Sequence, residues 1–131
     1  MLNLKGKRVY LACGKTDMRK SINGLAAIVE GSFKLDPFCG ALFVFCNRNR
    51  DRVKILEWDG DGFWLYFKRL EKGHFRWPGL SARAVPEGNG QGQLGDEKTM
   101  ILSGEELSIL LGGTKVELKL KRKDVTERKA I

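Results

Sequence analysis

The sequence predicts a single α+β domain over residues 1–131, in which one long helix packs on an antiparallel β-meander and a short second helix lies near the C-terminus. Three observations predict this fold: an amphipathic helical pattern near the start, apolar runs separated by turn residues in the middle, and a capping motif before a leucine-rich segment. With 131 residues, 42% of them hydrophobic, the chain is long enough for one core and too short for two.

The first strand and the long helix are predicted before residue 37. Val9–Ala12 is apolar and β-prone, and Gly14 ends that run. Thr16 and Asp17 then offer side-chain oxygens that could cap a helix, which should end near residues 34–36 because a proline follows. The apolar residues at helical spacing, which should face the core, are Ile22, Leu25, Ala26, Val29 and Phe33.

The middle of the chain predicts the β-meander. Ala41–Cys46 is continuously apolar, which is typical of a central strand or one covered on both faces. Val53–Trp58 and Phe63–Arg69 flank the turn sequence at 59–62 and should form a hairpin. His74–Trp77 is expected to add a short strand before the chain reaches a proline.

The last third of the sequence changes character. Residues 81–98 are rich in glycine and almost free of apolar residues, which predicts a flexible loop, with an extended β-hairpin as the alternative. Ser103 and Glu106 have the spacing of a capping box before a short helix, and the glycines from Gly112 should end it. Residues 121–131 are expected to form a frayed basic tail.

Charge and composition favour one class of partner. The formal net charge is +8 and the isoelectric point about 9.6, which favour a polyanion such as nucleic acid. No apolar run is long enough to span a membrane and the N-terminus does not resemble a signal peptide, so we expect a cytoplasmic protein with no membrane partner. The sequence indicates no oligomeric state. The cysteines, Cys13, Cys39 and Cys46, lack metal-ligand spacing and are expected to be buried reduced thiols, with no metal or other cofactor.

Two basic segments are candidate nucleic-acid contacts. Lys15, Arg19 and Lys20 surround the predicted start of the long helix, where free backbone N–H groups and a partial positive charge favour phosphate. The alternative is a helix with an ordinary solvated basic face.

The second segment is the turn NRNRDR at residues 47–52, which carries the guanidinium groups of Arg48, Arg50 and Arg52. In solvent these groups could form bidentate contacts with phosphates. Asp51 would neutralise part of this charge, and a loop that only increases solubility is the alternative.

The predicted third strand of the meander supplies a further candidate surface. Trp64 and Tyr66 should point away from the face covered by the long helix. If exposed, they could stack on unpaired bases, or they could instead cover the sheet or contact another protein. The basic residues expected to flank them are Lys68, Arg76 and Lys54.

Catalysis is not indicated. The run EWDGDG matches the start of a calcium-binding loop, but Lys68 stands at the twelfth position, where a glutamate is expected. The aspartates Asp17, Asp36, Asp59 and Asp61 are accounted for by capping and turns. No P-loop or GxGxxG motif occurs, so we expect a protein that is not an enzyme.

Several motifs occur together in one order: CGKTDMRK, DPF, a WDGDGF hairpin and RWP. In this combination the chain resembles, over residues 8–78 and more weakly 100–125, the TnpB accessory proteins of bacterial insertion sequences of the sixty-six type, which are unrelated to the RNA-guided nucleases of that name. The resemblance implies a non-catalytic helper of transposition, whose partners would be DNA, the transposase and other proteins of the same insertion sequence. An adaptor for the transposase that does not bind nucleic acid itself is the alternative.

Overall fold

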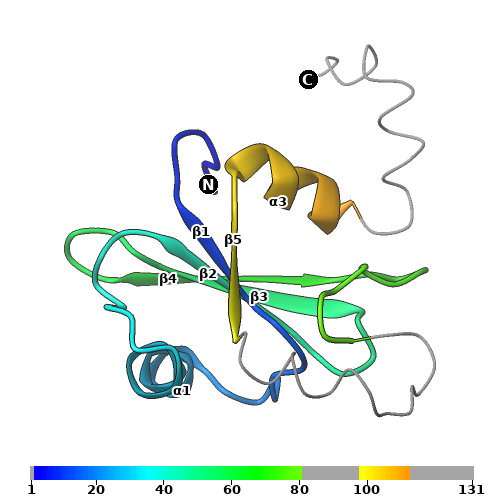
Figure 1. Ribbon diagram of the computed structural model, residues 1–131, viewed down its shortest axis with the longest axis horizontal. Coiled ribbons are helices and arrows are strands. Elements are labelled where there is room, and N and C mark those ends of the chain that lie inside the picture. The colour runs from blue at the N-terminus through cyan, green and yellow to red at the C-terminus, as the bar shows by residue number, and fades with distance from the viewer. Residues whose placement is uncertain (1, 81–97, 113–131) are drawn as a thin grey trace.

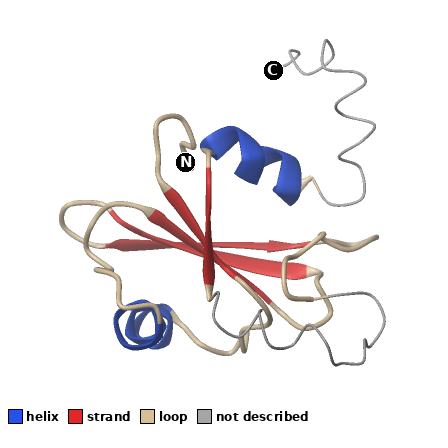
Figure 2. Cartoon of the chain, in the orientation of Figure 1, coloured by secondary structure: helices blue, strands red, loops and turns tan. Residues whose placement is uncertain are grey.

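The computed structural model describes residues 2–80 and 98–112, which form a five-stranded mixed sheet with a helical layer on each face (Figures 1 and 2). The strand order across the sheet is β4-β3-β2-β1-β5. The strands are β1 (Val9–Ala12), β2 (Leu42–Cys46), β3 (Arg52–Trp58), β4 (Phe63–Arg69) and β5 (Thr99–Leu102). The helical segments are α1 (Ile22–Ala27), its π-helical continuation η1 (Ile28–Ser32) and α3 (Gly104–Leu111).

The central strands confirm the predicted meander in part. β2, β3 and β4 are sequential antiparallel neighbours, and every residue of β2 is buried, as its apolar run predicts. β1, however, is parallel to β2, with Val9 opposite Leu42, so the expectation of a purely antiparallel sheet is wrong. The reason is the connection through α1, which crosses over the sheet and returns the chain to the end where β1 began.

Alternating strand residues divide the core into two layers. On the α1 face, Leu25 and Val29 pack with Phe43, Phe45 and Leu56. The opposite face packs under α3, whose Leu107 is fully buried. The other buried residues of this second layer are Val9, Leu11, Leu42, Val44, Cys46, Val53, Ile55, Phe75 and Trp77.

The first helix is shorter than expected. α1 and η1 together cover residues 22–32, and Ser21 precedes them without a side-chain capping bond. The carboxylate of Asp17 instead accepts the backbone N–H of Arg19, which holds residues 17–20 in a turn and delays the helix. The helix also ends before residues 34–36, and Lys34 adopts a left-handed φ of 60°.

Residues 74–77 do not form the predicted strand. This segment runs as irregular chain and does not pair with a strand along its length: the Phe75 N–H donates to the Arg50 carbonyl in the loop after β2, and the Trp77 indole donates to the carbonyl of Ala12 at the end of β1. Both aromatic side chains are nevertheless buried, which accounts for the apolar character that suggested a strand.

At the C-terminal end, the capping box is confirmed. Ser103 accepts the Glu106 N–H, and the Glu106 carboxylate accepts the Ser103 N–H. Strand β5, which forms an edge of the sheet beside β1, was not predicted. The predicted loop at 81–98, apart from Lys98, and the predicted tail at 121–131 lie outside the described residues.

The three cysteines form no disulfide and lie in three different environments. Cys46 is buried, and this burial raises its pKa to about 12. Cys13 is half-buried, and Cys39 is exposed in the turn before β2, so the expectation of a buried thiol is wrong for Cys39. In the two described stretches, no helix is long and apolar enough to cross a membrane.

Candidate nucleic-acid interface

The parallel pairing of β1 and β2 brings two basic segments to the same end of the sheet. The segment after β1 contains Lys15 and Lys20, and the loop after β2 contains Arg48. The Thr16 N–H donates to the carbonyl of Cys46, the last residue of β2, at 2.7 Å and joins the two segments directly. What we call the basic edge consists of four side chains: Lys15, Lys20, Arg48 and Lys98, the last of which precedes β5.

The backbone of this edge is fixed by further main-chain hydrogen bonds. Cys13 N–H donates to the Lys98 carbonyl at 2.9 Å, and Gly14 N–H donates to the Pro78 carbonyl at 2.8 Å. Gly14 has a left-handed φ of 81°, which a residue with a side chain rarely adopts. Three separate parts of the chain therefore determine where Lys15 and its neighbours are placed.

The turn at residues 17–20 is also ordered. The Arg19 guanidinium donates to the Asp17 carboxylate at 2.9 Å, and this hydrogen bond, with that from the Arg19 N–H, lowers the Asp17 pKa to about 2. On the other side of the turn, Lys54 Nζ of β3 donates to the carbonyls of Met18 at 2.8 Å and Lys20 at 2.9 Å. The three basic residues of the predicted phosphate site therefore precede the helix, which begins at Ile22, and do not lie in its first turn. The phosphate site itself stays a prediction.

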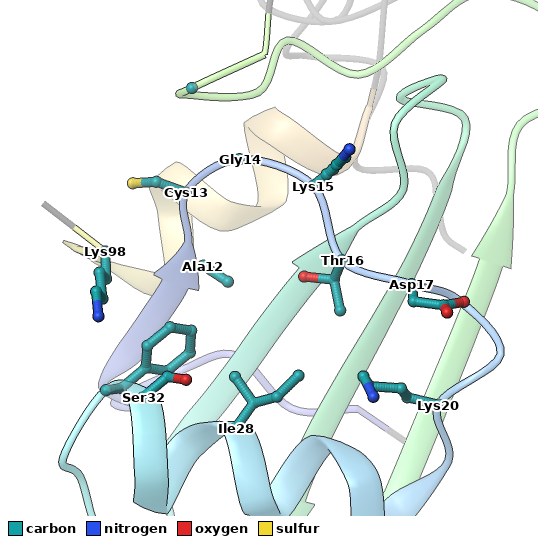
Figure 3. A pocket seen from close by; sticks show the side chains of 12 residues that line it. Ala12, Cys13, Gly14, Lys15, Thr16, Asp17, Lys20, Ile28, Ser32 and Lys98 are labelled. Carbon is teal, nitrogen blue, oxygen red and sulfur yellow. The ribbon is translucent and has the colours of Figure 1, made fainter. Parts of the chain in front are cut away.

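Figure 3 shows a pocket between this turn and the helix, with Lys20 and Lys98 at opposite sides. Its volume is about 480 Å³. Ile28 contributes an apolar wall, and Thr16 and Ser32 contribute hydroxyl groups. A second pocket of about 510 Å³ lies between residues 15–18 and the loop at 47–49. The two pockets give the basic edge a concave surface with cations on its rim.

The arginines of the NRNRDR loop have different environments. The Asn47 side chain accepts the N–H groups of Asp51 and Arg52 and closes the loop. Arg50 is half-buried and donates to the Phe75 carbonyl at 3.1 Å, while the Arg52 guanidinium lies 3.4 Å from the Asp51 carboxylate. Arg48 is exposed beside the second pocket.

The predicted aromatic surface lies on the α3 face and is not part of the basic edge. Tyr66 packs against the core and donates to the Glu57 carboxylate at 2.8 Å; burial first, and then this bond, raises its pKa to about 12. Trp64 is 51% exposed, and its indole donates to Asp59. Lys68 donates to the Leu111 carbonyl at the end of α3, at 3.0 Å.

One of the expected neighbours of these aromatic residues lies on the other face of the sheet, and the flanking position of Arg76 stays a prediction. Lys54 points to the α1 face, opposite Trp64, because it alternates with the α3-facing residues Val53 and Ile55. Arg76 is exposed between two buried aromatic residues of the irregular segment 74–77. The reasoning from sequence also missed Lys98, which became part of the edge only through the unpredicted strand β5.

Within residues 2–80 and 98–112, the histidine, cysteine and carboxylate side chains form no group that could hold a metal ion. The described acidic residue that lines both pockets is Asp17, which is paired with Arg19. The cations that line these pockets are Lys15, Lys20, Lys98 and Arg48, whose ammonium and guanidinium groups can bind anions.

Comparison with known proteins confirms the resemblance seen in the motifs. The family model described as IS66 Orf2 like protein matches residues 7–121. The uncharacterized protein y4jC of Sinorhizobium fredii (strain NBRC 101917 / NGR234) is 34% identical over 109 residues, covering 83% of this chain and 80% of the relative. The uncharacterized protein y4hO of the same strain is 42% identical over 78 residues, 60% of this chain and 68% of the relative. No solved structure matches the chain significantly.

Proposed function

This chain belongs to the family of IS66 Orf2-like proteins, and from that premise we propose that it is a non-catalytic accessory protein of DNA transposition that binds DNA, or the transposase–DNA complex, through the basic edge. The edge would contact phosphates of the DNA backbone. The protein would position DNA for a transposase that carries the catalytic residues.

The observation that supports this proposal is the convergence of exposed cations from three separate segments. Lys15 and Lys20 come from the segment after β1, Arg48 from the loop after β2, and Lys98 from the residue before β5. Each cation that neutralises a phosphate releases condensed counterions, so such an edge gains affinity for DNA without reading its sequence. The high net charge of +8 adds long-range attraction.

The structure changes the roles we assign within the predicted set. Arg48, Lys15 and Lys20 remain candidates for phosphate contacts. In the proposal, Arg50 positions the loop after β2 and does not contact phosphate. Arg19 contributes less to phosphate binding, because Asp17 accepts its hydrogen bonds. Lys68, Arg76, Arg52, Trp64 and Tyr66 are not needed for the proposed contact.

A transposase adaptor that does not bind DNA itself is the second candidate. The half-exposed ring of Trp64 favours it, because exposed aromatic residues are enriched at protein interfaces. The two functions differ in a direct binding measurement on purified protein.

That measurement uses fluorescence anisotropy with an insertion-sequence-end duplex, a scrambled duplex and a single strand. We expect binding by the wild-type protein, and a clear loss of affinity in the Lys15→Gln, Arg48→Gln double variant. The matched control is Lys5→Gln with Arg8→Gln, which removes the same charge before β1, at its other end. Absence of binding at low salt, together with capture of the transposase by the same preparation, would replace the DNA proposal with the adaptor.

A further inference from the structure

We propose that Phe67 stacks on an unpaired base and gives the basic edge a preference for single-stranded DNA. This inference rests on the proposed function, which it refines by naming the form of DNA bound. Phe67 lies on β4 and is 55% exposed, and it belongs to neither of the two core clusters. Phe63 and Leu65, which lie on the same face of β4 as Phe67, do pack against the core on the α1 side.

The strand register places Phe67 at the same end of the sheet as the basic edge. Phe45 of β2, Lys54 of β3 and Phe67 of β4 lie side by side in one row. The next residue of β2 is Cys46, whose carbonyl accepts the Thr16 N–H that begins the basic edge. A strand of nucleic acid held by the edge could therefore continue across the sheet toward Phe67.

Lys54 connects the Phe67 ring to the turn at residues 17–20. Its ammonium group lies 6.0 Å from the centre of the Phe67 ring and also bonds to the carbonyls of Met18 and Lys20. The exposed ring is thus held next to a positively charged segment. An aromatic platform beside cations is the arrangement that binds single strands, since bases stack on the ring while phosphates follow the charges.

The other exposed ring of β4 lacks this setting. Trp64 points to the opposite face, and its indole donates to the Asp59 carboxylate. The Asp59 carboxylate therefore lies beside the Trp64 ring, and a carboxylate near a ring repels the phosphates that accompany a stacked base. The two residues are similarly exposed, 55% for Phe67 and 51% for Trp64, so Trp64 is a matched control.

The test measures the affinity of the full chain for labelled oligothymidylate and for a duplex of equal length. We expect Phe67→Ala to weaken oligothymidylate binding about tenfold, which corresponds to the loss of about one stacked base, and to leave duplex binding nearly unchanged. Phe67→Leu, which keeps an apolar side chain without a ring, should show the same loss. Phe67→Tyr, which keeps a ring, should bind oligothymidylate as the wild type does. Trp64→Ala should bind as the wild type does.

The outcomes distinguish stacking by Phe67 from DNA binding by the basic edge. If Phe67→Ala and Phe67→Leu both bind oligothymidylate like Trp64→Ala, while Lys15→Gln with Arg48→Gln still weakens binding, stacking by Phe67 is wrong and the basic edge stands. An equal loss on duplex and single strand would also overturn the preference. If the wild-type protein binds neither DNA, both proposals fail. Circular dichroism of each variant confirms that it is folded.

Discussion

Arg50 and Phe75 are joined by two hydrogen bonds across 25 residues of sequence: the Phe75 N–H donates to the Arg50 carbonyl at 2.7 Å, and the Arg50 guanidinium donates to the Phe75 carbonyl at 3.1 Å. This pair connects the loop after β2 to the irregular segment that packs under the sheet. It explains why one arginine of the NRNRDR turn is half-buried while Arg48 remains exposed.

The first prediction follows from this pair. Arg50→Ala should lower the free energy of unfolding by about 1 kcal/mol, because it removes one hydrogen bond and leaves the Phe75 carbonyl without that donor. Urea denaturation measures the change. Arg48→Ala is the control and should alter stability by less than about 0.5 kcal/mol. Equal effects of the two substitutions would show that Arg50 does not hold the loop.

The second prediction concerns the pH dependence of the basic turn. Hydrogen bonds from Arg19 lower the Asp17 pKa from its ordinary 3.8 to about 2. Because the pKa is lower in the folded protein, the stabilisation by this pair is present above about pH 4 and is lost as the pH falls toward 2. NMR titration of the Asp17 carboxyl carbon should give a value near 2 in the wild type, and Arg19→Gln should raise it. A wild-type pKa near 3.8 would contradict the pairing.

The third prediction concerns the contact between the turn after β1 and the segment before residue 81. A Cβ added to Gly79 would lie 2.6 Å from the Gly14 nitrogen, and Gly79 has a φ of 84°. Gly79→Ala should therefore displace the Gly14 turn, lowering both stability and DNA affinity. Gly60→Ala is the control: its φ of 78° carries similar strain, but a Cβ there meets no atom within 4 Å. A thermal melt and a binding curve for each variant compare the two. Equal losses of DNA affinity would mean that the Gly14 turn does not position the basic edge.

The fourth prediction uses the partly buried hydrogen bond of Tyr66. Since its pKa is raised from 10 to about 12, the associated stability is complete below pH 10 and is lost as the pH rises toward 12. The chain has two tyrosines, so the ultraviolet titration of a Tyr10→Phe variant isolates Tyr66. Its midpoint should lie near 12, and a midpoint near 10 would show that the ring is solvated. Tyr66→Phe should cost about 1 to 3 kcal/mol, because Glu57 loses a donor in a partly buried site.

Much of the fold could be predicted because local patterns determine it. The apolar run of β2, the turn residues between β3 and β4 and the Ser103 capping box each specify a structure through neighbouring residues. The start of the first helix could not be predicted in this way. Asp17 suits a helix cap and a turn equally well. The turn is also held by Lys54, which bonds to the Lys20 carbonyl from 34 residues away in the sequence, and a local pattern does not reveal such a contact.

The candidate site was predictable only in its composition. Sequence reasoning identified Lys15, Lys20 and Arg48 as basic, but their convergence depends on the parallel pairing of β1 and β2. The role proposed for Phe67 depends on strand register, because a shift of one residue would place its side chain on the opposite face of the sheet. Trp64 and Tyr66 were favoured by residue type and by strand alternation, which correctly predicted that they face away from α1.

The most direct test of the central claim, that the basic edge contacts DNA phosphates, is the salt dependence of duplex affinity in the wild type and in Lys15→Gln, Arg48→Gln. The slope of log affinity against log salt should decrease in magnitude by about 1.8 in the double variant, or roughly 0.9 for each phosphate that the protein no longer neutralises. The Lys5→Gln, Arg8→Gln control should keep the wild-type slope. An unchanged slope and affinity in a folded Lys15→Gln, Arg48→Gln variant would contradict the account.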